Sequence, residues 1–171
     1  ICLLAFANHM KDNFSLHANE YAAYRPTYPA AFLEYLNGLI QNKQAAWDCG
    51  TGNGQLAVEL AQTFRQVFAT DISQKQINHA IKLHNIQYSV QSAESTNFKD
   101  HMFDLITVAQ AIHWFDFDRF YDEVKRTAKH HAIICVVGYG LLQISESIDR
   151  VITDFYTQVI GPYWDAERRF I

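Results

Sequence analysis

Glycine, proline and cysteine are all scarce in this chain of 171 residues, which contains seven, three and three of them. So few glycines and prolines exclude a collagen-like or low-complexity protein. The cysteines, Cys2, Cys49 and Cys135, have neither the even number of a disulfide framework nor the spacing of a zinc site. We therefore interpret them as reduced thiols and expect a cytoplasmic location.

Positive charge is also in short supply, because 14 Lys and Arg face 18 Asp and Glu, for a net charge of −4. Nucleic acids and anionic membranes both need concentrated positive charge, so neither is expected as a partner. No apolar run approaches the roughly 18 residues of a membrane span.

Helical and strand patterns alternate along the chain. Strands are expected over 45–49, 66–72, 86–91, 103–109 and 132–137, and helices near 32–40, 54–64, 73–81, 116–129 and 144–160. Ser73 is expected to cap the third helix, whose apolar positions are Ile77, Ala80 and Ile81. The fourth helix is expected to bury Phe117, Phe120, Tyr121 and Val124. Such alternation predicts an α/β protein with a doubly wound parallel sheet and helices on both faces. Residues 21–171 are interpreted as one domain and residues 1–20 as an N-terminal extension. Ligands of such sheets bind beyond the carboxyl ends of the strands.

The most informative segment runs from Asp48 to Gly54 and reads Asp-Cys-Gly-Thr-Gly-Asn-Gly. It lies between an expected strand and an expected helix, where alternating glycines permit unusual backbone angles and a close approach of ligand. A dinucleotide fingerprint that starts at Gly50 requires a third glycine at position 55, which is Gln55. A nicotinamide-dependent oxidoreductase is therefore disfavoured.

Asp71 ends the second expected strand, 17 residues after Gly54. A carboxylate at that position suits the two hydroxyls of a ribose. It equally suits the N-terminus of the helix that follows Ser73, whose dipole it stabilises. The two roles are compatible.

These residues together resemble the class I S-adenosylmethionine-dependent methyltransferases, type 11 among them. The resemblance extends from about Tyr21 to Tyr139 and implies a Rossmann-like sheet of order 3-2-1-4-5. The segment 111–116 and the early segment 24–29 are similar to a small-molecule subgroup that includes trans-aconitate methyltransferase.

The resemblance implies S-adenosylmethionine as cofactor, no metal, and a role for each matching residue. Asp48 is implied to orient the glycine loop, Gly50 and Gly52 to approach the methionine part, and Asp71 to hold the ribose. The cofactor-binding residues carried over are Asp48, Gly50, Thr51, Gly52, Gly54, Asp71, Ile72, Ala93, Glu94, Ala109 and Gln110.

One position departs from the family pattern. Many relatives have an acid just before the alanine that lines the adenine, whereas this chain has Ser92 before Ala93. Either Glu94 takes over that contact or the backbone alone holds the adenine. A third alternative is that Glu94 only faces water.

Four further residues are candidates for the acceptor side. His113 is the catalytic candidate: it can hydrogen-bond the acceptor, act as a general base, or be a structural histidine bonded to a nearby carbonyl. We expect it not to be an obligatory base. Trp114 is expected to pack on the cofactor or to wall the acceptor site. Tyr24 and Arg25 precede the first helix, where Arg25 suits a carboxylate of cofactor or substrate or packs among tyrosines.

We therefore expect transfer of a methyl group to a small molecule, for which an anionic carboxylate acceptor needs no base. The alternative is an inactive binding module that keeps the fold. The family sheet usually continues beyond its fifth strand, and the sequence contains no further strand pattern after Val137. We interpret the chain as truncated, with the fifth strand as an open edge. We expect it either to self-associate through that edge, as a homodimer, or to be marginally stable, and its methyltransferase activity to be weak or absent.

Overall fold

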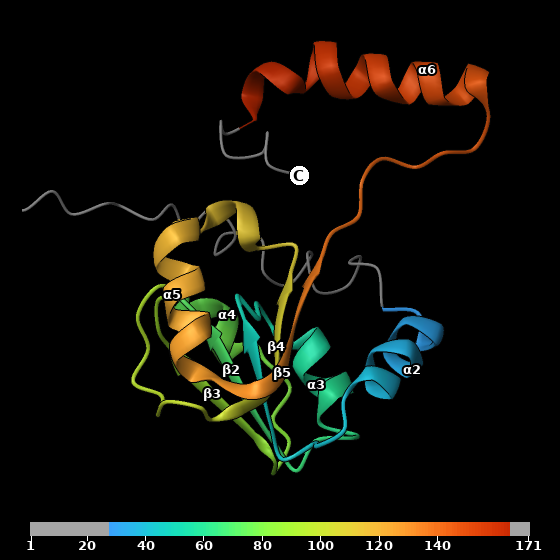
Figure 1. Cartoon of the computed structure of the whole chain (residues 1–171). Coiled ribbons are helices and arrows are strands. Elements are labelled where there is room, and N and C mark those ends of the chain that lie inside the picture. The colour runs from blue at the N-terminus through green and yellow to red at the C-terminus, as the bar shows by residue number, and fades with distance from the viewer. Residues whose placement is uncertain (1–27, 165–171) are drawn as a thin grey trace, which may run out of the picture.

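A five-stranded sheet forms the centre of the computed structural model, which describes residues 28–164 (Figure 1). The strands are β1 (Ala45–Cys49), β2 (Gln66–Asp71), β3 (Ile86–Val90), β4 (Phe103–Ala109) and β5 (Ala128–Val137). Their order is β3-β2-β1-β4-β5, and every neighbouring pair is parallel. The expected doubly wound topology is confirmed.

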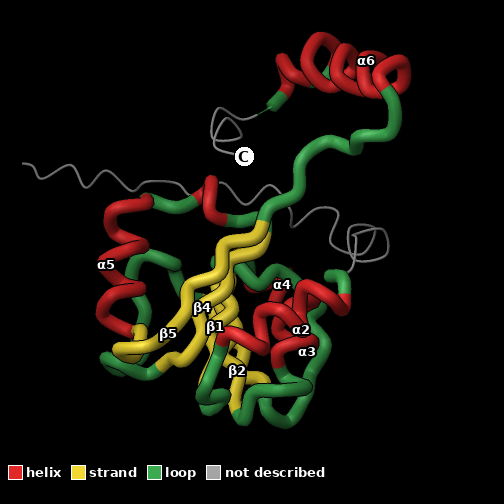
Figure 2. The backbone as a smooth tube through the Cα atoms, turned by 45° about the vertical axis from the view of Figure 1, so that its right-hand side comes forward, coloured by secondary structure: helices red, strands yellow, loops and turns green. Residues whose placement is uncertain are grey.

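Helices cover both faces of this sheet. They are α2 (Ala30–Leu39), α3 (Gln55–Leu60), α4 (Gln74–Asn78) and α5 (Phe117–Thr127), and a further helix, α6 (Glu146–Asp154), follows β5. Figure 2 shows α2 and α3 on one side of the strands and α5 on the other. Short helical turns follow at Ile112–Trp114, Phe155–Val159 and Gly161–Tyr163.

The two central strands carry the core. All residues of β1 and β4 are buried, as expected for strands covered on both faces. Under α2 and α3 the core is aliphatic and includes Leu36 and Leu60. Under α5 it is aromatic: the ring of Trp47 lies 5.7 Å from that of Phe103 and 6.3 Å from that of Phe120.

The connection from β3 to β4, residues 91–102, contains no helix. A parallel crossover usually carries a helix that covers the sheet. Here Phe98 fills that place, with its ring 5.0 Å from Phe103 and 5.6 Å from Trp47. The loop is therefore held by one partly buried aromatic side chain and by contacts with α5 described below.

Three sequence expectations about burial are wrong. Phe117 and Tyr121 were expected in the core, yet they are 37% and 41% exposed, because α5 turns Phe120 and Val124 toward the sheet instead. Ile81 was expected on a buried helical face. It is 59% exposed because α4 already ends at Asn78.

Strand β5 begins earlier than its apolar pattern indicated. The expected strand covered residues 132–137, whereas pairing with β4 starts at Ala128. The register shifts between the pairs Phe103–Ala128 and Leu105–Ile133. This irregularity accommodates the exposed His130 and His131, whose polarity hid the first part of the strand.

The helical pattern at 144–160 does form a helix, α6, over Glu146–Asp154. This helix does not cover the sheet. Helix α6 follows a long connection from the end of β5 and stands away from the strands (Figure 1). None of its residues is buried. Apolar side chains such as Ile148 and Val151 remain exposed, at 43% and 68%.

Among residues 28–164, no helix combines the length and apolar character that crossing a membrane requires.

Asp104 of β4 connects the amino-terminal ends of β1, β4 and β5. Its loss is expected to destabilise the protein. Its Oδ2 accepts from the backbone N–H groups of Gln44 and Ala45 at 3.0 Å each, and Lys129 Nζ lies 2.8 Å from Oδ1. Asp104→Ala should lower the free energy of unfolding by about 1.5–3 kcal/mol, the range for hydrogen bonds to a charged group. Denaturant titration measures the change. Asp122→Ala, which removes an exposed ion pair with Lys125, is the control and should change stability little.

Candidate functional site

The loop between β1 and α3 has a backbone that only glycines adopt easily. Gly50, Gly52 and Gly54 have φ angles of 67°, 58° and 85°. The N–H group of Thr51 donates to the carbonyl oxygen of Thr70 at 2.9 Å, which attaches the loop to the end of β2. The N-terminus of α3 therefore begins directly at the carboxyl edge of the sheet.

Two of these glycines also leave room for neighbouring protein groups. A Cβ atom on Gly50 would lie 2.6 Å from Cβ of Ala111 and 3.3 Å from the ring of Phe115. A Cβ atom on Gly54 would lie 2.2 Å from the hydroxyl oxygen of Tyr88. Packing thus explains glycine at positions 50 and 54, independently of any ligand. It also brings the glycine loop against the segment after β4 and against β3.

Asp48 connects the glycine loop to the two central strands. Its side chain is 2% exposed at the end of β1. Oδ1 accepts from the Thr107 hydroxyl of β4 at 2.8 Å, and Oδ2 accepts from the Thr51 hydroxyl of the loop. The carboxylate of Asp48 therefore joins the glycine loop to β4.

Asp71 lies beside this loop at the end of β2. Its Oδ2 accepts from the backbone N–H of Gly52 at 2.8 Å, and Oδ1 accepts from that of Ser73 at 2.8 Å. Ser73 in turn caps α4 by accepting from the N–H of Gln76. The structure thus brings Asp71 and the middle glycine together, whereas the neighbouring Ile72 is 44% exposed.

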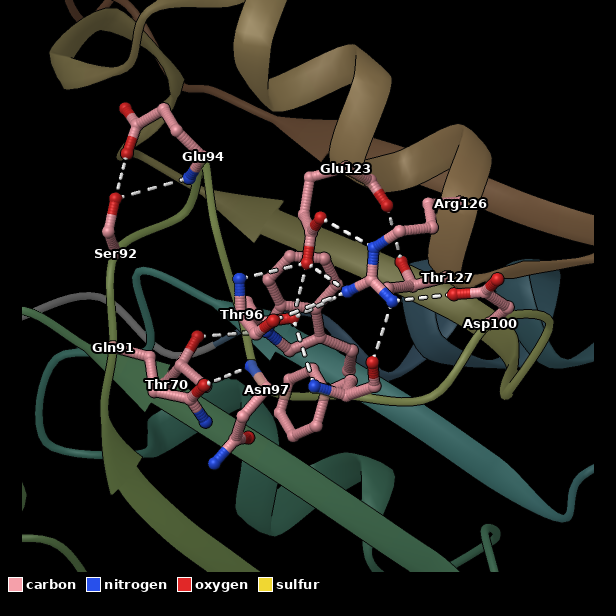
Figure 3. A network of polar contacts seen from close by, with 12 residues as sticks. Thr70, Gln91, Ser92, Glu94, Thr96, Asn97, Asp100, Glu123, Arg126 and Thr127 are labelled. Atoms are coloured by element: carbon pink, nitrogen blue, oxygen red, sulfur yellow. Dashed lines mark hydrogen bonds and ion pairs between the residues drawn. The ribbon is translucent and has the colours of Figure 1, made fainter.

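The segment after β3 forms a third side of the site. Ala93 is buried, at 6% exposure. The hydroxyl of Ser92 donates to Glu94 Oε2 (Figure 3). The backbone N–H of Asp116 donates to Glu94 Oε1 at 3.0 Å. Glu94 therefore does not simply face water: it links this segment to the start of α5.

The segment after β4 forms the fourth side. Ala109 is buried, and Gln110 adopts a φ of 56° while its N–H donates to Val137 of β5 at 2.8 Å. His113 is 6% exposed, and its ring centroid lies 4.6 Å from that of Trp114. Tyr24 and Arg25, the remaining candidates, lie outside the described residues.

Cys49 is positioned next to the glycine loop, but its chemistry is that of a core residue. Complete burial raises the pKa of its thiol well above the usual value, with the nearby Asp48 adding to the effect. Burial likewise raises the pKa of Tyr88 to about 12. Both groups are neutral near pH 7, so neither is an activated nucleophile.

Four further residues contact the glycine loop or Asp48: Thr107, Thr51, Tyr88 and Ala111. Only Thr51 was expected from the sequence to belong to the cofactor site. The sequence did contain a sign that Thr107 bonds to Asp48, because a buried aspartate at the end of an apolar strand needs hydrogen-bond donors. Thr107 is a polar residue within the apolar run of β4 and was available for that purpose. Nothing in the sequence indicated that Tyr88 and Ala111 pack on glycines. In the described part of the chain, no group of three or more His, Cys, Asp or Glu residues is arranged to hold a metal.

Comparison with known proteins agrees with this geometry. The profile of the methyltransferase domain family matches residues 47–136, which include the glycine loop, Asp71 and His113. A candidate methyltransferase of Dictyostelium discoideum is 34% identical over 164 residues, which are 94% of this chain and 62% of that protein. Methyltransferase cfoB of Aspergillus candidus is 37% identical over 100 residues, or 53% of this chain and 31% of that one.

Solved structures give the same result. A candidate type II methyltransferase from Anaeromyxobacter dehalogenans superimposes with a TM-score of 0.75 at 36% identity, over 85% of this chain and 62% of that one. The present chain thus spans 62% of the length of the Dictyostelium relative and of this bacterial structure. A matching profile over more than half of the residues, a parallel sheet of the family's order and a glycine loop joined to a strand-end aspartate all agree. The chain therefore belongs to the class I S-adenosylmethionine-dependent methyltransferases.

Proposed function

We propose that this protein transfers a methyl group from S-adenosylmethionine to a small-molecule acceptor. The observation that carries the proposal is the contact between the N–H of Gly52 and the carboxylate of Asp71, 2.8 Å apart. It fixes a backbone loop with little side-chain bulk next to a strand-end acid, at the sheet edge where ligands of this architecture bind.

The residues present fit this cofactor. Buried side-chain oxygens of Asn53 and Gln55 accept no hydrogen bond among residues 28–164. S-adenosylmethionine brings donors to such acceptors, through its ammonium group, its ribose hydroxyls and its adenine amino group. A carboxylate has about four lone-pair directions, so Asp71 can keep its two backbone bonds and also accept from a ribose.

We assign each side of the site a task. Asp71 would hold the ribose, Gly52 and Thr51 would lie along the methionine part, and Ala93 would offer its backbone to the adenine. Glu94 is already bonded to Ser92 and to the N–H of Asp116. We therefore favour the alternative in which the backbone holds the adenine and Glu94 supports that backbone.

When bound, S-adenosylmethionine supplies a methyl group that is already electrophilic. The protein then has to align an acceptor and exclude water. His113 and Trp114 are suited to this because their rings pack against each other, tilted by 46°, in the segment after β4. The neighbours Ala111 and Phe115 in that segment lie against Gly50 of the glycine loop. A site with few ionisable groups fits an acceptor that is already an anion, and a carboxylate is our proposed acceptor group. This agrees with the sequence resemblance to the trans-aconitate subgroup.

The surrounding protein is proposed to be one domain over residues 21–171, in a cytoplasmic enzyme. The thiols of Cys49 and Cys135 are both free, which supports a reducing compartment. The net charge of −4 supports a small-molecule partner over a nucleic acid.

Asp71→Ala tests the cofactor site. The change should weaken binding of S-adenosylhomocysteine by about 1.5–3 kcal/mol, because hydrogen bonds to a charged acceptor are lost. Titration calorimetry measures the affinity, with the exposed Asp118→Ala as the matched control. A folded Asp71→Ala protein with unchanged affinity would remove Asp71 from the cofactor site.

His113→Gln tests the acceptor side. We expect a loss of turnover of less than about tenfold, well below the 10²–10⁴-fold of a general base. Affinity for S-adenosylhomocysteine should stay the same. Turnover is measured on a panel of small carboxylic acids, and His84→Gln, at an exposed histidine, is the control. A drop of several orders of magnitude at unchanged cofactor affinity would make His113 the catalytic base.

The open edge of β5 is proposed to mediate a homodimer of this 171-residue chain. In the described sheet β5 pairs only with β4, and Ile134 and Val136 are 40% and 44% exposed. Size-exclusion chromatography with light scattering should show a dimer or a larger species. Ile134→Lys with Val136→Lys should shift it toward monomer, whereas Val151→Lys on α6 should not. A monomer at all concentrations, or dissociation only with the α6 variant, would be evidence against the edge.

A further inference from the structure

The segment proposed to face the adenine has no helix of its own to hold it. Residues 91–102 cross from β3 to β4 as an irregular loop that includes Ala93, Glu94 and Thr96. An irregular loop is ordinarily mobile unless side chains fix its backbone. Its attachments therefore decide how well the adenine side of the site is preformed.

Helix α5 supplies one such attachment from its last turn (Figure 3). Glu123 Oε1 accepts from the backbone N–H of Thr96 at 2.9 Å and also from the Thr96 hydroxyl. Arg126 donates to both oxygens of Glu123, at 2.9 Å and 2.6 Å. This is the two-pronged geometry that only a guanidinium provides.

The same guanidinium continues onto the loop. Its NH1 group donates to the carbonyl oxygen of Phe98 at 2.7 Å and to Asp100 Oδ1 at 2.7 Å. Its NH2 group reaches the carbonyl oxygen of Thr96 at 3.3 Å. Arg126 thus binds two backbone carbonyls of the loop while it is itself fixed by Glu123.

This pair differs from an ordinary surface ion pair. The Glu123 side chain is 8% exposed and that of Arg126 is 34% exposed. Burial alone raises the pKa of Glu123, but the hydrogen bonds from Arg126 and Thr96 outweigh it and hold that pKa below its usual value. Bonds to Glu123 and Asp100 raise the pKa of Arg126. Both groups are therefore charged near pH 7, and the buried Glu123 carboxylate is largely shielded from water.

The other end of the loop is attached to the same helix. Glu94 Oε1 accepts from the N–H of Asp116, the N-cap residue of α5, at 3.0 Å. The loop is consequently held at both ends of one rigid element. Ala93, which is proposed to face the adenine, is the residue directly before Glu94.

We propose that Glu123 and Arg126 are positioning residues, which hold the loop 91–102 in the conformation that receives the adenine of S-adenosylmethionine. The inference rests on the proposed function. Neither residue touches the ligand in this proposal: they act through the backbone of Thr96 and Phe98. Their loss raises the cost of ordering the loop when the adenine binds.

The chain offers a matched control pair on the same helix. Asp122 and Lys125 have the same spacing and a 3.0 Å ion pair, but both side chains are 76% exposed and reach no loop residue. Asp122→Asn and Lys125→Met therefore change the charge of α5 without touching the loop.

The experiment compares Arg126→Met, Arg126→Lys and Glu123→Gln with the two control variants in the full chain. Calorimetry gives affinities for S-adenosylhomocysteine and for 5′-methylthioadenosine, which lacks the methionine part. We expect the three test variants to lose about tenfold or more for both ligands and by a similar factor, because only the adenosine side is misplaced. Arg126→Lys should not restore binding, since one ammonium cannot replace the planar fork.

Hydrogen exchange over residues 91–100, read by mass spectrometry below the unfolding temperature, provides a second measurement. Faster exchange in the test variants, and partial recovery with saturating S-adenosylhomocysteine, are expected. Lower thermal stability with wild-type affinities would mean a purely structural pair and would overturn the inference. Equal loss in the control variants would also overturn it. If the wild-type chain binds neither ligand, the proposed function itself fails. If the wild-type chain binds both ligands and the test variants bind them equally well, only the positioning inference fails.

Discussion

The buried carboxylate of Asp48 is the constraint on which the rest of the site depends. A carboxylate that is 2% exposed needs hydrogen-bond donors in fixed positions, because burying it without them is costly. It obtains donors from Thr107 in the neighbouring strand and from Thr51 in the glycine loop. The same contacts that satisfy Asp48 therefore set the path of the loop relative to β4. The loop then meets Asp71 through the N–H of Gly52.

Helix α5 both packs on the core and holds the loop between β3 and β4, and its amphipathic pattern indicates only the first of these. Phe120 and Val124 cover the aromatic half of the core. Glu123 and Arg126, on an adjoining part of the helix, hold the loop between β3 and β4. The missing helix in that crossover is thus replaced by polar contacts from the next helix along the chain. Core packing and loop order depend on the same element.

Local features of the fold could be predicted because they depend on neighbouring residues. The continuous apolar run of β4, the N-cap at Ser73 and the strand before Gly50 were all identified from sequence. Phe117 and Tyr121 were misplaced because periodicity gives a buried stripe but not its edges. The shifted register of β5 was missed because two histidines interrupt its apolar pattern.

Contacts between distant residues could not be predicted in the same way. Arg126 bonds to Phe98, 28 positions away, and nothing in either local pattern indicates the other. The acid after Ala93 shows the same limit, since the sequence offered three roles for Glu94. Its bond to the N–H of Asp116 appears only once β4 brings α5 beside the loop.

The close fit of Gly50 against Ala111 and Phe115 restricts how this site can diversify. A methyl group at position 50 would come within 2.6 Å of the methyl group of Ala111, so neither residue can enlarge without displacing the other. The glycine loop and the segment after β4 are thus in close contact at this point, and a larger side chain in one requires a change in the other. The neighbouring Ile112 and Trp114 are only partly buried, so they can vary in size with less effect on the loop. Under the proposed function, a new acceptor specificity would arise at these two positions while the glycine loop keeps its shape.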